Sequence, residues 1–85
     1  MKKKIITVEL PDGLEARPAA MLVQVASQYD SRIYLESGSK RVNAKSIMGM
    51  MSLNLSEGTA ITVAADGEDE SEAVAGVEAF LVANK

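Results

Sequence analysis

The chain has 85 residues, of which 47% are hydrophobic and 25% charged, and it carries a formal net charge of −3 at pH 7. It contains neither cysteine nor histidine, which excludes disulfides, thiolate or imidazole metal ligands and a Ser-His-Asp triad. The length suffices for one domain of ordinary globular composition, expected to span residues 1–85. The acidic balance argues against direct binding to nucleic acid.

The first predicted element is a strand over residues 4–10, where apolar and polar side chains alternate and the even-numbered apolar ones face inward. Lys2, Lys3 and Lys4 open this segment, but the apolar run behind them ends at Glu9. A signal peptide needs about 7–15 apolar residues and a membrane-spanning helix about 20. We therefore expect no membrane association and a cytoplasmic location.

The first helix is predicted to begin at Arg17-Pro18 and to end near Gln28, because proline is tolerated in the first helical turn. The segment 11–13 (PDG) before it is typical of a turn. The inward stripe of this helix consists of Ala19, Leu22, Val23 and Ala26.

A β-hairpin is predicted next, from strands over 32–36 and 41–44 that flank the turn residues 37–40 (SGSK). A short helix over 47–53 follows it.

The last two elements are a strand over 59–65 and a helix over 69–83. Asp69 and Glu72 have the spacing of a capping box at the start of that helix. Its inward residues are expected to be Ala73, Val74, Val77 and Leu81, with Phe80 at the edge of the stripe. The order β-α-β-β-α-β-α favours an α+β fold in which helices cover one face of an antiparallel sheet.

The first polar feature with chemical potential is the segment 13–19 (GLEARPA), which leads into the first predicted helix. Unpaired N–H groups and the helix dipole favour an anion there, and Arg17 adds donors that suit a carboxylate or phosphate. Glu15 places a carboxylate beside both groups, which is equally compatible with a structural role at the helix end. A lone glutamate is weak evidence for acid–base catalysis.

The second polar feature is Ser46, which stands where the N-cap of the short helix is expected. Capping is the structural interpretation of this serine. A phosphate on the same hydroxyl would add about −1.5 to −2 charges facing the positive end of the helix. The spacing is compatible with both roles.

The third feature is an excess of apolar side chains around these two points. In the short helix Met50 and Leu53 are expected to face inward, which leaves other large apolar residues on the outer face. Exposed apolar patches mark partner surfaces, and methionine adapts to several partners. The surface predicted to bind a partner, called the apolar patch below, consists of Ala20, Met21, Ile47, Met48 and Met51.

Three segments resemble the signatures of the HPr family, the small phosphocarriers of the bacterial phosphoenolpyruvate:sugar phosphotransferase system: 13–19 (GLEARPA), 45–49 (KSIMG) and 67–70 (GEDE). The resemblance covers essentially the whole chain and includes the element order. It implies an HPr-like open-faced β-sandwich, with a four-stranded antiparallel sheet and three helices on one face.

One departure from the family pattern concerns the phosphocarrier histidine, whose position is occupied here by Glu15. Phosphotransfer in the family needs a nucleophilic imidazole, and glutamate could form only a hydrolysis-prone acyl phosphate. The resemblance is closer to the Crh subgroup, the catabolite-repression HPr proteins, which also lack this histidine and usually carry glutamine there. The segment 42–49 (VNAKSIMG) supports that subgroup, and we expect a regulatory protein rather than an enzyme.

The resemblance implies that Ser46 is phosphorylated by HPr kinase/phosphorylase and that the product acts as corepressor of the transcription factor CcpA. Arg17, Ile47, Met48 and Met51 match contact positions of the family. No cofactor and no metal are implied.

Several alternatives remain open at the level of sequence. The chain is also compatible with a histidine-replaced HPr, with a phosphocarrier acting through Glu15, and with a small-ligand sensor. Glu15 either mimics a phosphohistidine or only disables transfer, and the smaller charge of one carboxylate favours disablement. A monomer and a homodimer formed by exchange of the first strand, with a hinge near 11–13, are both compatible with the sequence.

Overall fold

The computed structural model describes residues 1–9, 16–53 and 58–82. The elements are, in chain order, β1 (Lys2–Thr7), α1 (Ala16–Ala26), β2 (Arg32–Ser37), β3 (Lys40–Asn43), α2 (Ile47–Met51), β4 (Ala60–Asp66) and α3 (Glu70–Leu81). The predicted order β-α-β-β-α-β-α is confirmed. The boundaries differ by a few residues, most of all in β1, which begins at Lys2 and ends at Thr7.

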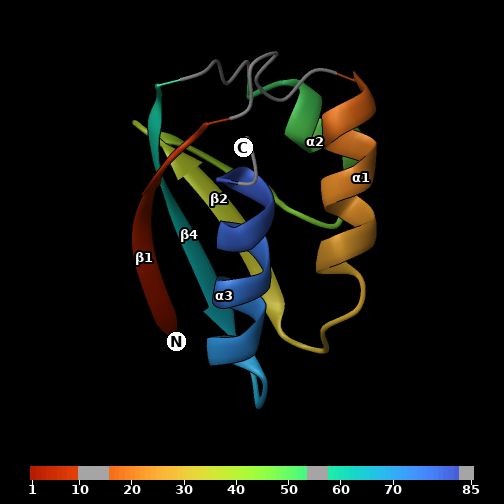
Figure 1. The fold of residues 1–85 in the computed structure, drawn as a ribbon, viewed down its shortest axis with the longest axis vertical. Helices are drawn as coiled ribbons and strands as arrows, with labels where there is room; N and C mark the ends of the chain where they lie inside the picture. The colour runs from red at the N-terminus through yellow and green to blue at the C-terminus, as the bar shows by residue number, and fades with distance from the viewer. Residues whose placement is uncertain (10–15, 54–57, 83–85) are drawn as a thin grey trace.

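The four strands form one antiparallel sheet in the order β1-β4-β2-β3. The central strand β4 therefore pairs with both β1 and β2, with Ile61 opposite Ile6 and Val63 opposite Leu35. The helices cover one side of this sheet, with α3 in front of β1 and β4 and with α1 and α2 beside each other (Figure 1). The predicted open-faced architecture is confirmed.

The hydrophobic core lies between the sheet and the helices, because alternate strand residues point to the same face. The apolar residues predicted to face inward on β2 and β4 are fully or almost fully buried, and so are Ile6 and Val8. Leu10 lies outside the described residues. The helices contribute buried side chains from the predicted stripes: Ala19, Leu22, Ala26, Met50, Ala73, Val74, Val77 and Leu81.

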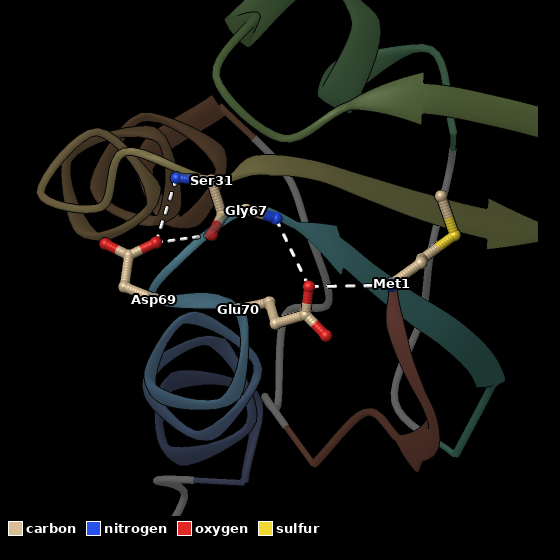
Figure 2. Close-up of polar contacts among 5 residues, drawn as sticks. All are labelled: Met1, Ser31, Gly67, Asp69 and Glu70. Atoms are coloured by element: carbon tan, nitrogen blue, oxygen red, sulfur yellow. Dashed lines mark hydrogen bonds and ion pairs between the residues drawn. The ribbon is translucent and has the colours of Figure 1, made fainter.

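The start of α3 differs from the prediction of a capping box. Asp69 occupies the N-cap position, but its side chain makes no capping hydrogen bond. Its carboxylate instead accepts hydrogen bonds from the backbone N–H groups of Asp30 and Ser31, each at 2.9 Å, and from the Ser31 hydroxyl (Figure 2). The capping-box prediction is wrong because three donors at the entrance to β2 converge on this carboxylate.

Glu70 makes a second set of contacts at the same end of the molecule. Its Oε1 accepts a hydrogen bond from the backbone N–H of Gly67 at 3.3 Å and lies 3.5 Å from the N-terminal amine of Met1 (Figure 2). Asp69 and Glu70 together tie α3 to the start of β2 and to the start of β1.

Asp69 gives the fold a predicted pH dependence. The Ser31 hydroxyl, followed by the N–H of Asp30, lowers the pKa of this carboxyl below its ordinary value of 3.8. Because the folded pKa is below the unfolded one, the stabilisation is fully present above about pH 4 and is lost as the pH falls through the folded pKa. We expect the difference in melting temperature between the wild type and Asp69→Asn to be constant near neutral pH and to shrink below about pH 4. Thermal melts followed by circular dichroism at several pH values measure this difference, and a difference that does not change with pH would contradict the assignment.

Candidate functional site

The segment between β3 and α2 is folded by its own polar groups. Asn43 accepts a hydrogen bond on its side-chain oxygen from the Lys45 N–H at 2.8 Å, and its carbonyl accepts one from the Ser46 N–H at 3.0 Å. A side-chain oxygen bonded to the N–H two residues on forms an Asx turn. This turn sets the direction in which the chain enters α2 and fixes the backbone of Ser46.

Ser46 is the N-cap of α2, as predicted. Its backbone is extended, with φ −113° and ψ 112°, and its hydroxyl oxygen accepts a hydrogen bond from the Gly49 N–H at 3.3 Å. The hydroxyl acts as acceptor in this bond, so the bond does not engage its own proton. Ser46 is exposed, and the hydroxyl is therefore open to chemistry from solvent or from a partner.

Gly49 leaves the surroundings of this hydroxyl uncrowded. A Cβ at position 49 would lie 3.5 Å from the Ser46 Oγ and 3.5 Å from the Val42 Cβ, which is ordinary van der Waals contact. Glycine thus leaves free the space that a methyl group would fill beside Ser46.

Lys45 is the one charged residue in the sequence between Asn43 and Leu53. Its Nζ donates a hydrogen bond to the Tyr29 carbonyl at 2.7 Å, just after α1. This bond anchors the turn before Ser46 to the first helix. The Lys45 ammonium therefore makes a structural contact, and a phosphate on Ser46 would reverse the sign of the local charge.

The apolar patch is exposed as predicted. Met48 is 80% exposed, Met21 51%, Met51 45% and Ile47 40%, whereas Ala20 is only partly exposed. The exposed residues come from α1 and α2, which pack against one another at the same end of the molecule (Figure 1). Ser46 is the N-cap of α2, so the part of the patch that α2 contributes follows the serine directly in sequence.

The two remaining site residues predicted from the sequence are not placed by the structure. Glu15 lies outside the described residues, and so does the suggested hinge at 11–13. Arg17 lies in the first turn of α1, but its side chain is not among those described. The structure therefore places Ser46 at the start of the helix that carries the exposed Ile47, Met48 and Met51. The roles of Glu15 and Arg17 stay predictions.

Two features of this site were not foreseen from the sequence. The hydrogen bond from Lys45 to the Tyr29 carbonyl joins two residues that are 16 positions apart in the chain, and no local sequence pattern predicts it. The Asx turn at Asn43 had a local signal, because asparagine favours such turns.

Some kinds of site are absent from the part of the chain that the structure describes. There, no cluster of three or more acidic side chains is arranged to hold a metal ion. Within residues 1–9, 16–53 and 58–82, none of the helices has the length and apolar character needed to cross a membrane.

Comparison with known proteins identifies relatives over nearly the whole chain. The family described as "PTS HPr component phosphorylation site" matches residues 2–83. Among curated proteins, the HPr-like protein Crh of Bacillus subtilis is 49% identical over 81 residues, covering 95% of each chain.

Solved structures give the same result. HPr-C-His from Thermoanaerobacter tengcongensis superimposes with a TM-score of 0.94 at 44% identity, covering 99% of this chain and 94% of that one. The crystal structure of the catabolite-repression protein Crh of Bacillus subtilis, described as a swapped, intertwined dimer, gives a TM-score of 0.80 at 48% identity, covering 99% and 97%.

Proposed function

The chain belongs to the HPr family, and from that premise we propose that it is a regulatory protein of the Crh type rather than a phosphohistidine carrier or an enzyme. The proposal is supported by the absence of histidine from the sequence, because the carrier reaction needs an imidazole nucleophile. Glu15 stands at the carrier position of the resemblance and disables the transfer. The likeness to proteins named Crh supports a role in catabolite repression.

Ser46 carries the proposed signal. In this mechanism the Ser46 hydroxyl attacks the terminal phosphoryl group of ATP or pyrophosphate on an HPr kinase/phosphorylase. The Oγ–P bond forms, ADP or phosphate leaves, and the hydroxyl proton passes to a base on the kinase. The observation that supports this role is the exposed N-cap hydroxyl, held by the Asx turn of Asn43 and flanked by the space at Gly49.

The phosphorylated protein is proposed to act as corepressor of a CcpA-type transcription factor. Partner recognition then combines two kinds of contact on one surface. The phosphate supplies a charge that a cationic partner group pairs with, and Ile47, Met48 and Met51 supply apolar area. Arg17 adds a further polar contact to the partner in this proposal. The chain itself is proposed not to contact nucleic acid.

Assembly and location form a further part of the proposal. The chain is proposed to act in the cytoplasm as one HPr-like domain and to exchange β1 with a second copy to form a homodimer. Two observations support the exchange. β1 is an edge strand that pairs only with β4 in the described sheet, and the Crh of Bacillus subtilis is described as a swapped dimer. Sedimentation at several protein concentrations distinguishes the monomer from the dimer.

The decisive experiment is a kinase assay on the intact chain. Incubation with a cognate HPr kinase/phosphorylase and labelled ATP is expected to add one phosphate to the wild type and none to Ser46→Ala. Ser52→Ala is the matched control, because Ser52 is an exposed serine at the opposite end of α2, and it should be labelled like the wild type. Label that persists in Ser46→Ala would overturn the assignment. Incubation with enzyme I and phosphoenolpyruvate should give no label, and a hydroxylamine-labile phosphate would instead identify a carrier acting through Glu15.

A further inference from the structure

The sulfur of this chain resides in five methionines, because the sequence contains no cysteine. Three of them belong to the apolar patch, where Met48 is 80%, Met21 51% and Met51 45% exposed. We propose that the apolar patch is a redox-sensitive surface, on which oxidation of Met48, Met51 and Met21 to methionine sulfoxide by peroxide prevents partner binding even when Ser46 is phosphorylated.

The chemistry is a two-electron oxygen transfer. The thioether sulfur attacks one oxygen of hydrogen peroxide, the O–O bond breaks, an S–O bond forms, and the second oxygen leaves as water after proton transfer. Sulfur is oxidised and peroxide reduced, and the product is a polar, chiral side chain that methionine sulfoxide reductases return to methionine. The modification is therefore reversible.

Oxidation would act on the physical basis of docking. An apolar surface binds a partner because removing it from water is favourable. A sulfoxide oxygen is a strong hydrogen-bond acceptor, and burying it without a donor costs free energy because its hydration is lost. The cations at the two ends of α2 already have acceptors: the Lys45 amine donates to the Tyr29 carbonyl at 2.7 Å, and the Lys40 amine donates to the Ser52 carbonyl at 3.0 Å. This step rests on the proposed function, since it requires the apolar patch to be the docking surface.

The chain contains two internal controls for such oxidation. Met50 lies in the same helix as Met48 but is fully buried, so its oxidation reports opening of α2. Met1 is 60% exposed at the N-terminus, beside Glu70 (Figure 2) and at the opposite end of the molecule from α2 (Figure 1). Its oxidation measures the reactivity of an exposed methionine outside the patch.

The first part of the test measures where peroxide reacts. The intact chain is treated with limiting hydrogen peroxide, and sulfoxide is located by mass spectrometry of its peptides. Met48 is expected to oxidise at a rate similar to Met1 and at least about tenfold faster than Met50, since exposure controls access to the sulfur. Equal rates for Met48 and Met50 would overturn the proposal.

The second part measures the consequence for binding. Peroxide is expected to weaken binding of the Ser46-phosphorylated chain to a CcpA-type repressor by about tenfold or more, and treatment with methionine sulfoxide reductases should restore it. The triple variant Met21→Leu, Met48→Leu, Met51→Leu is first titrated untreated to set its own baseline affinity, and that affinity should not change after peroxide, because leucine has no sulfur to oxidise. Met50→Leu is the matched control, which should still lose affinity.

The outcomes separate this inference from the proposed function. Unchanged binding after oxidation of Met48, or an equal loss in the triple variant, overturns the redox inference while leaving the docking surface intact. Failure of the reduced, phosphorylated chain to bind the repressor overturns the corepressor role. In that case the test of the redox inference is the rate at which the kinase labels Ser46 in the reduced and in the oxidised chain. A slower rate in the oxidised chain supports the inference, and equal rates overturn it.

Discussion

Gly67→Ala is expected to destabilise the fold by about 3 kcal/mol, at the upper end of the range for side chains forced into a packed site. A Cβ at position 67 would lie 2.7 Å from the Ser31 Oγ and 2.8 Å from the Ser31 Cα, and the φ of Gly67 is +157°. The Cα atom belongs to the backbone and cannot rotate away, so the link between β4 and the start of β2 must shift. The shift would also displace the groups that donate hydrogen bonds to Asp69.

The matched control for this prediction is Gly38→Ala in the turn between β2 and β3. Gly38 also has a positive φ, +60°, but a Cβ there would meet nothing within 4 Å. We expect Gly38→Ala to lower the free energy of unfolding by only about 1–2 kcal/mol, because alanine must adopt the left-handed backbone conformation there. Urea denaturation measures both variants, and a domain of this size should lose roughly 4–8 °C of melting temperature per kcal/mol. Equal losses in the two variants would show that the contact with Ser31 is not the cause.

The strands and helices could be predicted from the sequence because their signals are local. Alternation placed Ile6 and Ile61 on the inner face, and helical spacing placed Leu22 and Val77 there, and all four are buried. The capping of α3 could not be predicted in this way. Asp69 has the residue type and spacing of a cap, but its carboxylate bonds the Asp30 N–H, which is 39 residues away in sequence. Only the packing of α3 against the start of β2 brings these groups together.

The candidate site likewise combines features that local sequence predicts with features that depend on tertiary packing. The N-cap role of Ser46 and the exposure of Met48 follow from local rules, residue type in one case and helical spacing in the other. The anchoring of Lys45 to the Tyr29 carbonyl depends on how α1 packs against the turn, so no pattern in the sequence shows it. The phosphoacceptor role proposed for Ser46 rests on the family resemblance, because a capping serine and a phosphorylated one have the same local sequence.

Met50→Ala and Met48→Ala are expected to separate the stability of the fold from its partner binding. The two residues lie in the same helix on opposite faces, Met50 fully buried and Met48 80% exposed. Truncating the buried side chain removes its packing and leaves a cavity, which should destabilise the fold by about 2–5 kcal/mol. Truncating the exposed one should change stability by no more than about 0.5 kcal/mol.

Binding should show the opposite order. Met48→Ala removes the most exposed apolar side chain next to Ser46, and loss of such a central contact reduces affinity by about tenfold or more. Met50→Ala, measured at a temperature where it remains folded, should keep most of its affinity once Ser46 is phosphorylated. Urea denaturation and titration of the phosphorylated variants against a CcpA-type repressor measure the two effects. A Met48→Ala variant that binds like the wild type would show that the apolar patch is not part of the docking surface. A Met50→Ala variant that loses affinity in proportion to its loss of stability would show that α2 must be rigid before a partner can bind it.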